Sequence, residues 1–140
     1  MDQLFMRLLL YVWASPGSVI GLIAAILSWC TGGSCRIHTG VLEVSGGFAR
    51  WVLRNLVLPK GGASAMTLGH VVIAVSRDAL NSTRSHERVH VRQYERWGPM
   101  FIPAYLACSI WCAIRGRDVY FENPFEKEAF EKEAYAKESA

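Results

Sequence analysis

Two long stretches of this chain contain no charged residue, and each approaches the length of a membrane-spanning helix. The first covers residues 8–30 and the second residues 97–114. An α-helix needs about 20 apolar residues to cross the hydrocarbon core of a bilayer. These segments account for much of the 51% hydrophobic content, against 19% charged residues. The chain thus has enough apolar surface to fold, which excludes an intrinsically disordered protein.

The first apolar segment has the character of a membrane anchor. Pro16 and Gly17 interrupt it, which would kink a membrane helix or divide it into two short halves. A cleaved signal peptide would use residues 8–14 as its apolar core, but the sequence stays apolar well beyond any cleavage site. We therefore predict an uncleaved anchor or embedded segment over residues 1–30 and a domain over residues 31–140. The alternative is an apolar helix packed inside that domain.

Turn residues and apolar runs predict an α+β fold with short antiparallel strands. Residues 40–47 and 67–76 are expected to be strands, because both contain β-branched residues and are bounded by turn residues. Residues 48–58 fit either a helix or a strand. Helices are expected from the capping residues 81–83 to Trp97, from Pro103 to Ile114, and from Asn123 nearly to the C-terminus.

The helix that follows residues 81–83 contains the motif HExxH, formed by His86, Glu87 and His90. Two histidines four residues apart lie on one face of a helix, so both imidazoles can reach a single metal ion. Zinc lowers the pKa of a bound water toward neutrality, and Glu87 stands where it can take that proton. With 4 histidines, random placement would produce this motif roughly 0.007 times in a chain of this composition. The motif therefore predicts a zinc site.

A catalytic zinc ion needs a third protein ligand and keeps its fourth position for water. Metzincins have a glycine and a further histidine downstream, but Gln93 and Arg96 stand at those positions. Residues 123–130 (NPFEKEAF) are the only dense supply of ligands after the motif. They begin a predicted helix, and Glu126 starts a Glu-x-x-Ala pattern in it.

An HExxH helix, an intervening helix and a helix with Glu-x-x-Ala resemble the gluzincin type of zinc metallopeptidase. This resemblance implies that Glu126 is the third zinc ligand, with Glu128 and Glu131 as alternatives on the same helix. Many gluzincins carry an acidic residue four positions after the ligand glutamate, where it supports the first histidine. Phe130 stands there in this chain, so the supporting carboxylate is expected from elsewhere.

The composite pattern HERVHVRQYERWGP…NPFEKEA resembles small, membrane-associated bacterial zincin-like proteins over residues 67–135. The resemblance implies a small zincin-like domain, Zn²⁺ as cofactor and a peptide or protein substrate. In zincins the strand before the active helix often pairs with the substrate backbone, which here means residues 67–76. Tyr94 or Tyr105 could stabilise an oxyanion, and the sequence does not choose between them.

The metal hypothesis also constrains the second apolar segment. If residues 97–114 crossed a bilayer about 30 Å thick, His90 and Glu126 would lie on opposite sides of it. Ligands must approach one ion to about 2 Å. The segment therefore cannot span the bilayer if His90 and Glu126 bind the same ion. Pro99 and Pro103 favour a bent hairpin. We therefore predict that this segment is a buried apolar helix.

The charged residues carry weaker signals. A formal charge of +3 without a concentrated basic domain does not favour nucleic acid as a partner. The predicted metal-site helix has a basic surface, which is either solvated or in contact with anionic lipid headgroups. More arginines follow the first apolar segment than precede it, so the positive-inside rule places the domain in the cytoplasm. The arginines of that helix surface are Arg84, Arg88, Arg92 and Arg96.

The sequence as a whole predicts a small zinc metallopeptidase, attached to the bacterial inner membrane by its first 30 residues and by lipid contacts of that segment. His86, His90 and Glu126 would bind zinc, and Glu87 would activate water. The competing hypotheses are a catalytically inactive zincin-like binding or assembly protein, and a membrane protein with an accidental HExxH. His70 is expected to be a structural histidine. The oligomeric state is not predicted.

Overall fold

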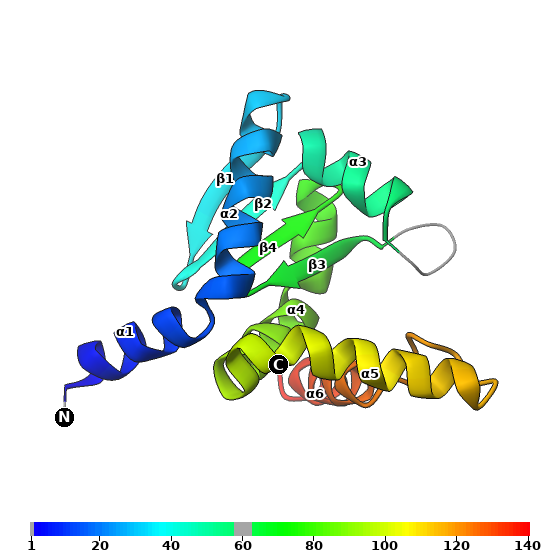
Figure 1. Cartoon of the computed structure of the whole chain (residues 1–140). Coiled ribbons are helices and arrows are strands. Elements are labelled where there is room, and N and C mark those ends of the chain that lie inside the picture. The colour runs from blue at the N-terminus through cyan, green and yellow to red at the C-terminus, as the bar shows by residue number, and fades with distance from the viewer. Residues whose placement is uncertain (1, 58–62) are drawn as a thin grey trace.

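The structure is a computed structural model that describes residues 2–57 and 63–140. It has α+β architecture, as the sequence predicts: a small sheet with helices on both faces (Figure 1). The elements in chain order are α1 Gln3–Trp13, α2 Ser15–Cys30, β1 Ser34–His38, β2 Val41–Ser45, α3 Gly47–Asn55, β3 Ala65–Leu68, β4 Val71–Ala74, α4 Arg77–Trp97, a 3₁₀ turn η1 Gly98–Met100, α5 Phe101–Ile114 and α6 Pro124–Glu138.

The sheet is mixed rather than wholly antiparallel, which corrects the sequence prediction. Its strand order is β1-β2-β4-β3. β1 and β3 pair antiparallel with their neighbours, but the two central strands β2 and β4 run parallel. The chain leaves β2 through α3 and returns through β3, so β4 enters the sheet in the same direction as β2. Of the ambiguous residues 48–58, residues 48–55 belong to helix α3, and residue 58 lies outside the described residues.

The single strand expected over residues 67–76 is wrong. Gly69 adopts a positive φ of 64° and turns the chain, so the segment is a hairpin of β3 and β4. A side chain at Gly69 would collide with Ser18 of α2, whose hydroxyl accepts a hydrogen bond from the His70 backbone at 3.0 Å. The turn is therefore built around the close approach of α2. β1 was not expected at all.

α2 lies across one face of the sheet and α4 across the other (Figure 1). α2 contacts the sheet through a row of small residues, because Gly17, Gly21, Ala24 and Ala25 are its buried positions together with a serine. Ala24 and Ala25 share one hydrophobic cluster with strand residues such as Val44. The division of the chain into a membrane segment over residues 1–30 and a separate domain stays a prediction. The second half of that segment, α2, packs on the sheet.

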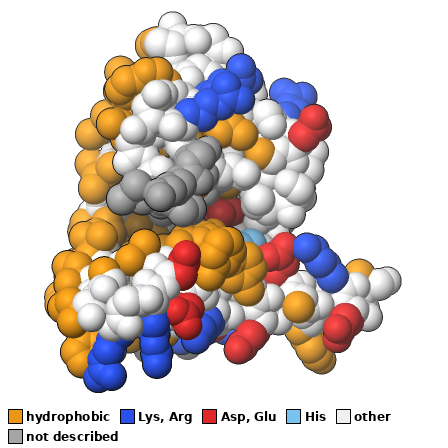
Figure 2. All heavy atoms as spheres, turned by 90° about the vertical axis from the view of Figure 1, so that its right-hand side faces the viewer, with side chains coloured by type: hydrophobic (Ala, Val, Ile, Leu, Met, Phe, Trp, Pro, Cys, Tyr) orange, Lys and Arg blue, Asp and Glu red, His pale blue; other side chains and the backbone are white. Residues whose placement is uncertain are grey.

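The opposite face of α2 is open, and so is most of α5. In α5 only Phe101 and Cys112 are buried, whereas Leu106, Ile110 and Trp111 are more than half exposed. The prediction of a buried apolar helix is therefore wrong: α5 lies at the outside of α4 and α6, with little of the chain over it (Figure 1). Figure 2 shows hydrophobic side chains along one whole edge of the molecule.

Some helices are long and apolar enough to cross a membrane, but this is weak evidence that they do so. One continuous helical stretch, Arg77–Ile114, is long and apolar enough to cross a bilayer, and only 17% of its apolar window is buried. α1 and α2 pass the same test only as a pair, and they are bent by 74° at their junction. Helices in the cores of soluble proteins and signal sequences also pass this test.

Replacing Gly21 by alanine tests whether α2 belongs to the core. A Cβ at Gly21 would stand 2.5 Å from Cβ of Val71, so we expect Gly21→Ala to lower the free energy of unfolding by about 1–3 kcal/mol. A detached anchor helix would instead gain up to about 1 kcal/mol from the better helix former. Denaturant unfolding in detergent measures the sign. Ile20→Ala, on the exposed face of α2, is the control and should change stability by less than about 0.5 kcal/mol.

Candidate metal centre

α4 carries both histidines of the motif and begins earlier than expected. Ser76 is its N-cap and accepts a hydrogen bond from the backbone N–H of Ala79 at 3.1 Å. The expected cap at residues 81–83 lies inside the helix. Within α4, His86, Glu87 and His90 are all buried. Helical spacing therefore directs both imidazoles into the protein, toward α6.

α6 supplies the third side chain, and its start agrees with the sequence. Asn123 is the N-cap: its side-chain oxygen accepts from the Phe125 N–H at 3.0 Å, and its amide donates to Ser109 of α5 at 2.9 Å. Pro124 opens the helix, where a missing N–H costs nothing. This fixed start places Glu126 in the first turn of α6, buried against α4.

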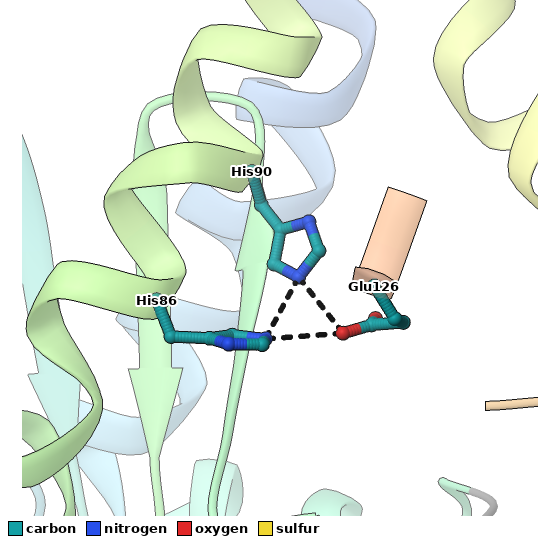
Figure 3. Close-up of side chains that lie close together, drawn as sticks. All are labelled: His86, His90 and Glu126. Carbon is teal, nitrogen blue, oxygen red and sulfur yellow. Dashed lines mark hydrogen bonds and ion pairs between the residues drawn. The ribbon is translucent and has the colours of Figure 1, made fainter. Parts of the chain in front are cut away.

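His86, His90 and Glu126 converge on one point (Figure 3). Nε2 of His86 lies 3.2 Å from Nε2 of His90, and Oε2 of Glu126 lies 3.0 Å and 3.3 Å from these two nitrogens. Ligands at about 2.0 Å from a tetrahedral ion stand about 3.3 Å apart. The spacing of the three donor atoms therefore fits a zinc ion bound by two imidazoles and one carboxylate.

The two alternative glutamates do not join this group. Glu128 binds elsewhere, accepting hydrogen bonds from Gln93 at 2.8 Å and from Arg96 at 3.2 Å. Glu131 is exposed. Among the residues that the structure describes, the only cluster of three potential metal ligands is that of His86, His90 and Glu126.

The far nitrogen of the His90 imidazole is hydrogen-bonded. Nδ1 of His90 donates to Oε1 of Gln93 at 2.8 Å, and the Gln93 amide donates to the Phe125 carbonyl at 3.0 Å, which fixes its orientation. This arrangement makes Nε2 of His90, which faces Glu126, the nitrogen that would ligate a metal.

The supporting carboxylate for His86 comes from Glu133. Its Oε2 lies 3.3 Å from Nδ1 of His86, within ion-pair distance although outside good hydrogen-bond geometry. Glu133 stands seven residues after Glu126, so both lie on the same face of α6, two turns apart. Phe130, between them, packs its ring against His86 at 4.6 Å. The seven-residue spacing was a signal that sequence reasoning missed.

Glu87 lies beside the histidine pair and is held by the sheet. The Thr67 hydroxyl of β3 donates to Oε2 of Glu87 at 2.7 Å. Burial raises the pKa of Glu87, because the charged form loses its hydration. A carboxylate with a raised pKa is a stronger base than an ordinary glutamate. Glu87 therefore has the environment of a proton acceptor.

A cavity of about 410 Å³ opens onto these groups. Its wall includes Glu87, His90 and Glu126, with strand β3 along one side and three tyrosines on the other. The Tyr105 hydroxyl donates to Oε1 of Glu126 at 2.7 Å, and burial raises the pKa of Tyr105. The tyrosines are Tyr94, Tyr105 and Tyr120, of which Tyr120 was not anticipated from the sequence.

His90 and Glu126 form a buried ion pair. Burial alone would lower the pKa of His90, but the Glu126 carboxylate outweighs burial and raises that pKa to about 9. Burial opposes the charge of Glu126 as well, yet hydrogen bonds with His86 and His90 hold its pKa at about 2. His90 thus carries a proton at neutral pH, and a bound cation would take the place of that proton.

Comparison with protein-family models, curated proteins and solved structures returned no match. The case for a metal centre therefore depends on the geometry of the described residues.

Removing the carboxylate of Glu126 tests the third ligand. We expect Glu126→Gln to weaken zinc binding by more than about 100-fold, because a neutral amide replaces a charged ligand and loss of outer partners alone costs 10–100-fold. Competition with a chromophoric chelator measures the affinity. Glu131→Gln, on the exposed side of α6, should bind zinc as the wild type does. Unchanged zinc binding in Glu126→Gln would contradict the assignment.

Proposed function

We propose that the protein is a zinc-dependent, membrane-associated metallopeptidase of gluzincin type. The observation that carries this proposal is the convergence of two imidazole nitrogens and one carboxylate oxygen within 3.3 Å of one another. The side chains come from helices about 40 residues apart and are buried together. Two histidines and a glutamate are a ligand set of catalytic zinc sites, which keep one position open.

The residues around the site divide the chemistry among them. His86, His90 and Glu126 would hold a zinc ion, which would supply Lewis acidity at this position. Glu87 accepts the proton of the attacking water at its carboxylate and later passes it to the leaving amine. Thr67 orients that carboxylate through its 2.7 Å hydrogen bond. Tyr105 holds Glu126 in place, and Tyr94 or Tyr120 remains on the cavity wall to stabilise negative charge on the carbonyl oxygen.

A peptide is the substrate class that the cavity favours. β3 is an edge strand of the sheet, and its residues Ala65–Leu68 line the cavity that holds Glu87. An extended peptide can pair with such an edge through its backbone and gains affinity without a particular sequence. Pairing there would carry the scissile bond past Glu87. The apolar wall, which includes Leu106, would receive hydrophobic side chains of the substrate.

The exposed apolar helices support the proposal of attachment to a membrane. α1 has no buried residue, and α2 and α5 each leave large hydrophobic side chains open. A monomeric soluble protein rarely exposes so much contiguous apolar surface. We propose that these helices lie in one leaflet, with lipid contacts from α5 as well as from the N-terminal segment. The arginine distribution favours the cytoplasmic face of a bacterial inner membrane.

The second candidate function is a zincin-like binding or assembly protein without catalysis. A cavity of about 410 Å³ is near the lower end of the range for ligand sites. The buried pair of His90 and Glu126 is also satisfied without a metal ion. This alternative has the same fold but no turnover.

Glu87→Gln separates the two functions. If Glu87 is the base, the variant should keep its zinc and lose at least about 100-fold in peptide hydrolysis, because general-base catalysis typically contributes that much. Turnover of a peptide library together with metal analysis measures both properties. Glu131→Gln serves as the control of equal charge change. Hydrolysis that persists in Glu87→Gln, or no hydrolysis by the wild type with bound zinc, would refute the peptidase.

A further inference from the structure

A second cavity, of about 700 Å³, lies on the other side of α4 from the metal centre. Four parts of the chain form it: α1, the turn between β1 and β2, the turn between β3 and β4, and the outer face of α4. Its lining is strongly basic, with a single carboxylate. The charged and titratable lining residues are Arg7, His38, His70, Arg84, Arg88, Arg92 and Glu95.

This cavity uses a different face of α4 from the metal centre. Arg84, Arg88 and Arg92 recur every four residues and so form one row along the helix. Arg88 is two residues from both His86 and His90, which corresponds to about 200° of rotation around the helix axis. Ligands of the two cavities would therefore bind independently of each other. Substitutions in the arginine row need not affect the histidines on the opposite face.

Part of the positive charge is already neutralised inside the protein. Glu43 of β2 is buried and accepts hydrogen bonds from Arg84 at 2.8 Å and 2.9 Å. Arg88 lies 3.5 Å from the same carboxylate and donates to the His38 carbonyl. Arg7 and Arg92 have no ion pair among the residues that the structure describes. The cavity thus keeps two uncompensated guanidinium groups.

His70 adds a buried polar atom without a partner. Its side chain is 7% exposed, and its Nε2 lies 2.9 Å from the Glu95 carboxylate. Its Nδ1 has no hydrogen-bond partner among the described residues. Tyr11 of α1 covers the ring at 4.2 Å and ties α1 to the turn by donating to the Gly40 carbonyl at 2.6 Å. Buried polar atoms are normally satisfied, and the described residues leave this nitrogen, in a residue that lines the cavity, without a partner.

We propose that this basic cavity binds a phosphate group. Guanidinium groups match the tetrahedral, multiply charged oxygens of phosphate through paired, charge-assisted hydrogen bonds. Arg7 and Arg92 provide the uncompensated charge, and His70 also lines the cavity. A cavity of about 700 Å³ accommodates a phosphate with an attached polar group, such as a lipid headgroup.

α1 indicates where such a phosphate would come from. The side of α1 with Arg7 and Tyr11 lines the cavity, whereas Leu4, Leu8 and Val12 are 69%, 55% and 70% exposed. Arg7 is the one charged residue of α1, and an exposed, otherwise apolar helix that carries a cation can lie in the membrane interface, at the level of the headgroups. The phosphate of an anionic lipid is thus within reach, and free inorganic phosphate is the other source of the same chemistry.

The experiment compares two double variants of the full chain that lose the same charge. Arg7→Gln/Arg92→Gln removes the two free guanidinium groups of the cavity, and Arg54→Gln/Arg117→Gln removes two exposed arginines outside it. Vesicle flotation measures partitioning onto phosphatidylcholine, with and without phosphatidylglycerol. Thermal unfolding in sodium phosphate and in sodium chloride of equal ionic strength tests the free anion. Zinc content checks that each variant is folded at the metal centre.

Phosphatidylglycerol should increase the partitioning of the wild type onto vesicles. We expect this increase to fall about tenfold more in the cavity variant than in the control variant. A fall on vesicles alone identifies the lipid as the source. A rise of the wild-type unfolding midpoint in phosphate, absent from the cavity variant, identifies the free anion. An equal loss of vesicle partitioning in both double variants would mean that the positive charge acts nonspecifically, and would overturn the proposal. It would also be overturned if neither phosphatidylglycerol nor inorganic phosphate had any effect on the wild type. None of these outcomes depends on peptide hydrolysis.

Discussion

Burial of the Glu126 carboxylate is the constraint on which the candidate site depends. An unpaired buried carboxylate costs several kcal/mol, so its partners must be in place. His86 and His90 of α4 and Tyr105 of α5 all lie within 3.3 Å of its oxygens. This requirement fixes how α6 docks against α4. The same docking brings Glu133 within 3.3 Å of His86, so the contact between these two residues follows from the position of Glu126.

α4 connects the functions proposed for this protein. One face carries the histidines toward α6, and the opposite face carries arginines toward α1 and the β1–β2 turn. The sheet anchors the helix, since the Thr67 hydroxyl of β3 holds Glu87. α2 and α5 present apolar surface outside this framework. α4 therefore positions both the candidate metal centre and the basic cavity, whereas the exposed apolar surface lies on other helices.

The sequence correctly predicted that both histidines of the motif lie on one face of a helix and that α6 starts at Asn123. Helical periodicity and capping depend only on residues that are close in the sequence. The same reasoning could not find β1, the hairpin turn at Gly69 or the partners of the imidazoles, since these depend on contacts between distant segments. α5 shows the limit most clearly. An uncharged apolar segment has the same pattern whether it faces a core or a lipid phase, and only the packing of α5 outside α4 and α6 distinguishes the two.

The coordination shell of the bound metal is the most direct test of the account. X-ray absorption at the zinc edge, on protein loaded with one equivalent of zinc, reports the type and distance of the ligands. The geometry of His86, His90 and Glu126 predicts a shell of nitrogen and oxygen at about 2.0 Å, with multiple scattering from two imidazoles and no sulfur. A shell with sulfur from the free cysteines, or one without imidazole scattering, would contradict it.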